Sequence, residues 1–170
     1  MNAGTGIKIT GDENDNFIQK YLNPITFGLD EQLITLCAVL SGYLSFPQKR
    51  IIIALIIMAF SNSLPDTLSY YEEKVGDGQE ANLALKESTI VFLSEIISTF
   101  IVILPILFIK DTKTSIILSY VIIFTILILV NYYKNKDILG AIYKLPIYIL
   151  IGFIIWFISM MSQKYLKISI

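Results

Sequence analysis

The stretch RIIIALIIMAFSNSLPDTLSYYE, residues 50–72, has the length and composition of a helix that crosses a membrane. Asp66, near the end of this apolar stretch, is its most unusual residue. A carboxylate inside a membrane-spanning helix costs roughly 2.5–3.5 kcal/mol on insertion scales, so such a residue is by default a candidate for function. Asn62 lies one helical turn earlier, and the two side chains therefore share one face of the helix.

Four further apolar segments predict four more spans. The chain has 170 residues, of which 55% are hydrophobic and 16% charged, and this charged share is well below the roughly 25% of a typical soluble domain. We predict an all-α, polytopic membrane protein with five transmembrane helices in one membrane domain, residues 24–170. Residues 1–23 are predicted to be a polar tail with a short interfacial helix that stops before Pro24. The predicted spans are about 27–46, 50–71, 88–109, 114–133 and 145–163.

The composition excludes several function classes. The net charge is −1 and no segment forms a basic stripe, so nothing indicates a nucleic-acid partner. The chain has no histidine and one cysteine, Cys37, which exclude a Ser-His-Asp triad, an internal disulfide and a cage of several cysteines. No glycine-rich phosphate loop is present. We therefore do not expect an enzyme, nor a permanently bound cofactor.

The predicted second span carries a polar stripe that favours a divalent cation. Met58, Asn62, Asp66 and Glu73 follow one another at helical spacing, and Glu72 adjoins the last of them. Carboxylate and amide oxygens suit cations such as Mn²⁺ and tolerate Fe²⁺, whereas a thioether favours softer ions. Alternatively, Met58 is a packing residue, Glu73 is simply solvated, and Asn62 with Asp66 forms a hydrogen bond between helices.

Asp30 is the expected partner of Asp66. The short turn at residues 47–49 makes the first two spans antiparallel neighbours, and the two acids lie about 25 Å from that turn at about 1.5 Å per residue. Two carboxylates at one depth can share a proton or a cation if they face each other. Alternatively, Asp30 caps the start of its own helix at the surface.

Two further acidic features are candidates for the cation site. Glu95 lies inside the third span among serines and threonines, where it completes the cation site, carries protons or is a hydrogen-bonded structural acid. Residues 72–87 form the longest predicted loop, and five acids lie in it. This loop is either a solvated connector or an acidic vestibule that concentrates cations.

The pattern resembles the vacuolar iron transporter family over about residues 24–163. The resemblance rests on Phe27-Gly28-Leu29-Asp30 before an apolar stretch ending in Ser41-Gly42, and on AFSNSLPDTLSY at residues 59–70. It also rests on Phe92-Leu93 with Leu104-Pro105 in the third span, and on the order of tight turn, long loop and tight turn. Glu31 stands where the family has a glycine, and the cytoplasmic metal-binding insert between the second and third spans is absent.

The resemblance implies a function, a location and a site. It implies proton-coupled exchange of Fe²⁺ or Mn²⁺ out of the cytosol, a homodimer in a lipid bilayer, and a cytosolic N-terminus. The metal path would include Asp30, with Asn62 and Asp66 from the second span. Glu72 and Glu73 would collect metal at the mouth, and Glu95 would relay protons. The alternative is a non-transporting membrane scaffold or assembly subunit with the same fold.

Overall fold

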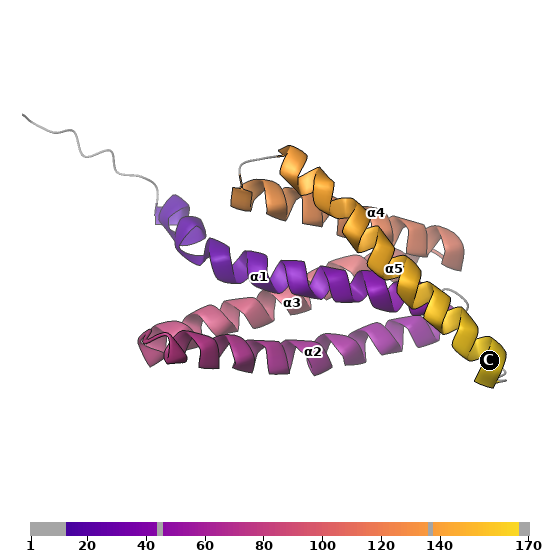
Figure 1. Ribbon diagram of the computed structural model, residues 1–170, viewed down its shortest axis with the longest axis horizontal. Coiled ribbons are helices and arrows are strands. Elements are labelled where there is room, and N and C mark those ends of the chain that lie inside the picture. The colour runs from indigo at the N-terminus through magenta and orange to yellow at the C-terminus, as the bar shows by residue number, and fades with distance from the viewer. Residues whose placement is uncertain (1–12, 44–45, 136–137, 167–170) are drawn as a thin grey trace, which may run out of the picture.

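The computed structural model describes residues 13–43, 46–135 and 138–166, and these ranges are helical apart from short connections (Figure 1). Each of the five helices contains a stretch that is long and apolar enough to cross a membrane. The predicted fold class is therefore confirmed, and the helices indicate a multi-pass membrane protein. They are α1 (Glu13–Gly42), α2 (Gln48–Gly76), α3 (Ala81–Phe108), α4 (Thr112–Asn135) and α5 (Ile138–Leu166).

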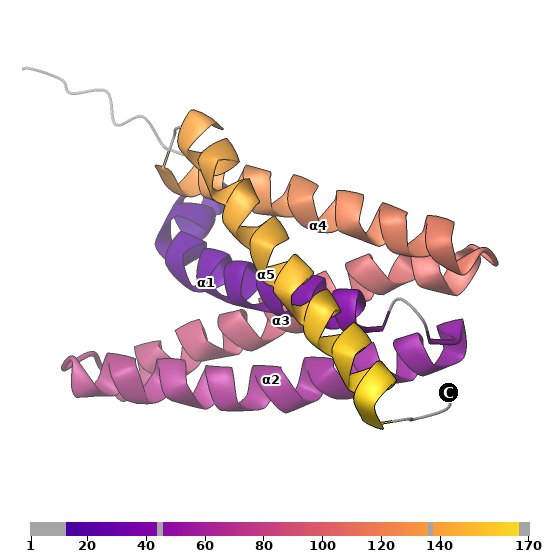
Figure 2. The same cartoon turned by 45° about the vertical axis from the view of Figure 1, so that its right-hand side comes forward.

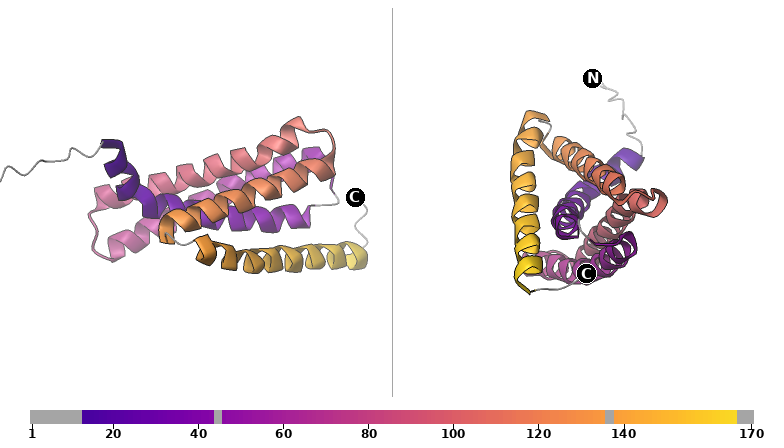
Figure 3. Two further views of the ribbon diagram at one scale, coloured as in Figure 1. Left: turned by 90° about the horizontal axis from the view of Figure 1, so that it is seen from above. Right: turned by 90° about the vertical axis from the view of Figure 1, so that its right-hand side faces the viewer.

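Two details of the predicted organisation are wrong. No helix stops before Pro24, because α1 continues through this residue, and only its N-terminal part bends away from the bundle (Figure 3). Proline removes one helical hydrogen bond, which neighbouring structure can compensate. Residues 72–87 are not a long loop either: α2 runs to Gly76 and α3 begins at Ala81. Residues 1–12 of the predicted tail lie outside the described part of the chain.

The helices pack around α1. Seen end-on, α1 lies in the middle of the bundle, and it contacts each of the other four helices (Figure 3). Helix α2 packs mainly against α3 and touches α1 less. The first two helices, which were predicted to be direct antiparallel neighbours, are therefore joined largely through α3. The described N-terminal end of α1 and the end of α5 lie at opposite ends of the bundle, as an odd number of spans requires (Figure 1).

Local contacts set the two boundaries of α2. Gly78 has φ 86°, a left-handed conformation that favours glycine, and it ends α2 with its N–H donating to the carbonyl of Val75 at 3.0 Å. At the other end of α2, the Gln48 amide donates to the carbonyls of Ile106 and Ile109, which the end of α3 leaves open. These contacts fix the start of α2 against the end of α3.

Asp111 starts α4. The Thr114 hydroxyl and backbone N–H both donate to Oδ2 of Asp111, at 2.5 and 2.9 Å, as expected for an N-cap. Asp111 lies between the α3 and α4 spans, and these hydrogen bonds hold its pKa below the ordinary value of 3.8. The charged form of this carboxylate is therefore the form that stabilises the helix start.

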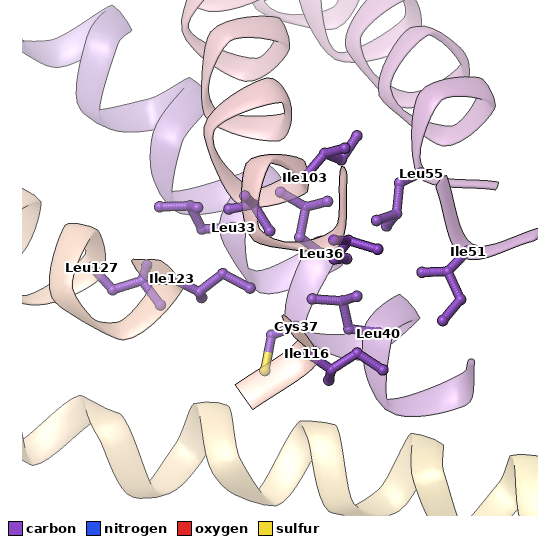
Figure 4. Packing of buried hydrophobic residues seen from close by; sticks show 12 residues of the cluster. Leu33, Leu36, Cys37, Leu40, Ile51, Leu55, Ile103, Ile116, Ile123 and Leu127 are labelled. Carbon is purple, nitrogen blue, oxygen red and sulfur yellow. The ribbon is translucent and has the colours of Figure 1, made fainter. Parts of the chain in front are cut away.

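The apolar core occupies one half of the bundle. Leu33, Leu36 and Leu40 of α1 point to the residues of α2, α3 and α4 that surround them (Figure 4). Burial of these side chains supplies packing contacts that hold the helices together in a membrane, where the hydrophobic effect between helices is weak. The other buried residues of the apolar core are Cys37, Ile51, Leu55, Val102, Ile103, Ile106, Ile116, Ile123 and Leu127. Cys37 is a free cysteine that is buried in this core.

Helix α5 lies across α1 and α4 and leaves most of its surface uncovered (Figure 2). Its close approach occurs at Gly152, where an added Cβ would lie 3.1 Å from Ser41 Oγ and 3.5 Å from Cys37 Sγ. The Ser159 hydroxyl also donates to the carbonyl of Gly42 at 2.8 Å. Small residues and hydroxyl bonds of this kind are common between membrane helices.

Candidate functional site

A polar cluster lies where α1, α2 and α3 meet, beside the apolar core. Its central residue is Glu95 of α3, whose side chain is 0% exposed. Glu95 is at the middle of its helix, roughly 20 Å from either end at about 1.5 Å per residue. The third span was predicted to begin at about residue 88, whereas α3 begins at Ala81. Glu95 therefore lies deeper in its helix than was predicted.

The backbone of α1 passes directly over Glu95. A Cβ added at Gly28 would lie 2.7 Å from the carbonyl oxygen of Val91 and 3.3 Å from Cγ of Glu95. Only glycine allows this close approach, which brings the next turn of α1 against α3. On that turn the Gln32 amide donates to Thr99 Oγ1 at 2.7 Å. The Gly28 contact therefore helps to enclose the carboxylate of Glu95.

Helix α2 supplies two hydroxyl groups to the cluster. Ser63 is fully buried and lies beside Glu95, although the contact does not meet hydrogen-bond geometry. Thr67 lies one turn further along the same face, and its hydroxyl oxygen is buried too. This face continues that of Ile51, Leu55 and Ala59, which pack in the apolar core or near it.

Several polar atoms of the cluster have no hydrogen-bond partner within residues 13–43, 46–135 and 138–166. They are both carboxylate oxygens of Glu95, Oε1 of Gln32, Oγ of Ser63 and Oγ1 of Thr67. A buried polar group without a partner costs free energy, about 1–3 kcal/mol for each neutral group and more for a charge. Such a concentration of unpartnered oxygens is typical of a site that binds a proton, a water molecule or a cation.

Asp66 belongs to the edge of this cluster. It is half-buried, and it interacts electrostatically with Glu31 of α1 and with Glu95. Glu31 is exposed and lies at the middle of the α1 span. The carboxylates found to interact with Asp66 are therefore Glu31 and Glu95. Because these three like charges repel one another, a bound proton or cation would lower the energy of the group.

The structure places Asp30 toward α4. The Asn131 amide lies 3.5 Å from Asp30 Oδ1, and Asn131 is fully buried. Asp30 and Glu31 also line a groove of about 320 Å³ that reaches Lys134. The expected pairing of Asp30 with Asp66 stays a prediction, and the alternative that Asp30 caps α1 is wrong because α1 begins at Glu13.

The other residues of the predicted stripe lie apart from the buried cluster. Met58 packs against the apolar core, in line with its alternative interpretation. Asn62 is half-buried one turn before Asp66, and Glu72 and Glu73 are exposed near the end of α2. In the part of the chain that the structure describes, no three His, Cys, Asp or Glu side chains come together to hold a metal ion. Metal binding by this set stays a prediction.

Sequence reasoning missed Gln32, Ser63 and Thr67. A usable signal was present for two of them: Ser63 and Thr67 continue the spacing of Ile51, Leu55 and Ala59, so they lie on the packed face of α2. For Gln32 the signal was its place inside an apolar span, directly after the acidic residues Asp30 and Glu31. A polar residue on a packed membrane face is expensive and needs a partner or a ligand.

The class of protein that the fold and this cluster define is a polytopic α-helical membrane protein with a buried carboxylate where three helices meet. Comparisons with family models, with curated proteins and with solved structures give no match. The resemblance to the vacuolar iron transporter family therefore stays a prediction from the motifs alone.

Proposed function

We propose that the protein is a proton-coupled membrane transporter of a divalent cation, with Fe²⁺ or Mn²⁺ as substrate and movement out of the cytosol. The metal and the direction come from the resemblance of the sequence. The observation that carries the proposal is the unpartnered, fully buried carboxylate of Glu95 inside the membrane-spanning part of α3. An acid in such a place is expensive to keep and is typical of ion paths and proton relays.

The arrangement around Glu95 suits an exchange of charges. Glu31, Asp66 and Glu95 interact, so a cation near Asp66 lowers the repulsion on Glu95, and a proton on Glu95 lowers the repulsion on Asp66. In a low-dielectric environment this coupling is stronger than in water. Binding of metal and binding of protons are therefore linked, which is what an exchanger requires.

The residues of α2 supply the path in this proposal. Asp66 is the principal metal ligand, and Asn62, one turn away on the same face, adds an amide oxygen. Glu72 and Glu73 are exposed near the end of α2, where carboxylates raise the local concentration of cations. Asp30 lines the neighbouring groove with Glu31 and offers a second route to the cluster.

A scaffold function is the second candidate, and one observation favours it. Asp30 lies against the buried Asn131 of α4, as a structural acid does when it joins two helices. A membrane scaffold or assembly subunit would keep this contact and would carry no ion. The two candidates differ in whether the protein carries an ion flux that is lost when the acids are neutralised.

Reconstitution into liposomes tests the proposal. Mn²⁺ uptake is measured for the wild type and for Asp66→Asn, Asp30→Asn and Glu95→Gln. Glu80→Gln is the matched control, because Glu80 is an exposed carboxyl at the α2–α3 connection. The proposal expects Asp66→Asn and Glu95→Gln to reduce uptake by at least about tenfold, the effect of roughly 1.4 kcal/mol. Wild-type uptake no faster than that of protein-free liposomes would favour the scaffold.

A further inference from the structure

Two buried hydroxyl groups on the inner face of α2 differ from other buried hydroxyls of the protein. Ser41, Ser98 and Thr99 are buried in helices, and each donates to a carbonyl of its own helix three or four residues earlier. The hydroxyl oxygens of Ser63 and Thr67 are also buried, but neither has a hydrogen-bond partner within the described ranges. Because they make no such bond to their own backbone, both hydroxyls are free to donate and to accept elsewhere.

These hydroxyls form a line with the phenol of Tyr70. Ser63, Thr67 and Tyr70 follow one another at spacings of four and three residues, so they lie on one face of α2. Ser63 lies beside Glu95. At the other end of the line, Tyr70 is 5% exposed and donates to Glu87 Oε2 at 3.5 Å, a long hydrogen bond. The line thus joins two carboxyl groups of α3 that are about 12 Å apart along the helix, at about 1.5 Å per residue.

The line leads from Glu95 toward one end of the bundle. Glu87 is half-buried in the first turns of α3, at the end where α2 and α3 connect and where the described part of α1 begins (Figure 1). On the opposite side of Glu95, Gln32 and Thr99 hydrogen-bond to each other, and the apolar core follows. Packed hydrocarbon on that side offers a proton no acceptor, whereas the hydroxyls on the other side do.

We propose that Ser63, Thr67 and Tyr70 form a proton pathway that connects Glu95 with Glu87 and with the water at the α2–α3 connection. Each hydroxyl accepts a proton from one neighbour on a lone pair and passes its own proton to the next. The proton leaves one carboxyl group and arrives at the other, and only O–H bonds break and form. Neighbouring hydroxyls are separated by about 4.5–6 Å along α2 at about 1.5 Å per residue, a gap that one bridging water spans.

The pathway deepens the proposed function, and its link to transport rests on that function. There Glu95 carries the exchanged proton, and the pathway leads it to the end of the bundle where Glu72 and Glu73 are exposed. Two further acids, Asp66 and Glu31, also interact with Glu95, and a route through the half-buried Asp66 is the competing path. Proton exchange at Glu95 can be measured without transport, because the pathway lies within a single protomer.

Infrared spectroscopy of the purified, reconstituted full-length protein tests the pathway. The carboxyl C=O band that is lost in Glu95→Gln belongs to protonated Glu95, and it shifts when deuterium replaces the proton. After a change from H₂O to D₂O, at a pH where this band has its full intensity, the rate of the shift measures how fast protons reach Glu95. Thr67→Val and Tyr70→Phe keep the side-chain shape and remove a hydroxyl, so each should slow the shift at least about tenfold. A loss of packing alone would open the bundle and speed the exchange, so slower exchange identifies a relay.

The controls match the variants in chemistry. Thr125→Val removes a hydroxyl from an exposed position of α4, and Tyr143→Phe removes a phenol from a 78% exposed position of α5. Both should keep the wild-type rate. Asp66→Asn tests the competing route and should slow the exchange less than Thr67→Val or Tyr70→Phe does. If one of these two variants does not fold, the other decides the question.

A wild-type exchange rate in Thr67→Val or in Tyr70→Phe would overturn the proposal, as would a Glu95 band that is absent at every pH. Slower exchange in Asp66→Asn alone would assign the route to Asp66 instead. Failure of the pathway is distinguishable from failure of the proposed function. A protein that moves Mn²⁺ and keeps the wild-type exchange rate in both variants rejects the pathway alone. Slower exchange in both variants of a protein that moves no Mn²⁺ rejects the divalent transport alone.

Discussion

The substitution Gly28→Ala tests the helix crossing that encloses Glu95. An alanine Cβ would lie 2.7 Å from the carbonyl oxygen of Val91, a distance that side-chain carbons essentially never adopt. The oxygen belongs to the backbone of α3, so no rotamer change relieves the clash and the two helices must separate. Overpacking of this kind costs roughly 1–3 kcal/mol, and alanine returns at most about 1 kcal/mol of helix propensity.

Because the clash is with backbone, the cost falls in the upper part of that range, roughly 2–3 kcal/mol, and the expected net loss is roughly 1–2 kcal/mol. Such a loss lowers the Tm by roughly 2–8 °C for a chain of this size. Gly42→Ala is the matched control on the same helix, because its Cβ would meet only Ile155 Cγ2 at 3.9 Å, an ordinary contact. Thermal unfolding of both variants in one detergent measures the difference. A Gly28→Ala protein as stable as Gly42→Ala would refute the close crossing of α1 and α3.

Three further predictions concern other contacts. Asp111→Ala should destabilise the start of α4 at neutral pH. Because the pKa of Asp111 is lowered in the folded protein, the stability that its carboxylate contributes is present above pH 3.8 and disappears as the pH falls through the folded pKa. Unfolding curves at several pH values check this dependence. Tyr120→Phe removes the contact of 2.7 Å with the Ser41 hydroxyl and should cost roughly 0.5–1.5 kcal/mol, whereas Tyr143→Phe at a 78% exposed position should cost almost nothing. A double-mutant cycle of Ser41→Ala with Tyr120→Phe should show a coupling of about 0.5 kcal/mol or more, and strictly additive losses would contradict the contact.

The number and type of helices could be predicted from the sequence because long apolar segments have few alternatives in a membrane. The ends of the helices were harder to predict. Gly76 and Gly78 both lie in the predicted loop at residues 72–87, but of the two only Gly78 adopts a positive φ, and α2 persists through Gly76. Pro24 suggested a helix end, yet α1 passes through it, since the membrane strongly favours paired backbone groups.

The candidate site could be predicted only in part. Asp66 and Glu95 were recognisable because a charged residue in an apolar span is rare. The interaction of Asp66 with Glu31 depends on the rotation of α1 about its axis, and neighbouring residues on a helix point about 100° apart. A depth estimate cannot supply that rotation. It therefore could not distinguish Asp30 from Glu31, which lie at nearly the same depth but face different helices.

A simultaneous flux measurement tests the central claim most directly. Purified protein is reconstituted into liposomes that hold a pH-sensitive dye, and Mn²⁺ entry is recorded together with the lumenal pH. The proposed exchange predicts that Mn²⁺ entry makes the lumen more alkaline, and that Glu95→Gln loses this coupled pH change while Glu80→Gln keeps it. Mn²⁺ entry without any change of lumenal pH, or an unaltered coupled change in Glu95→Gln, would contradict proton-coupled transport through this site.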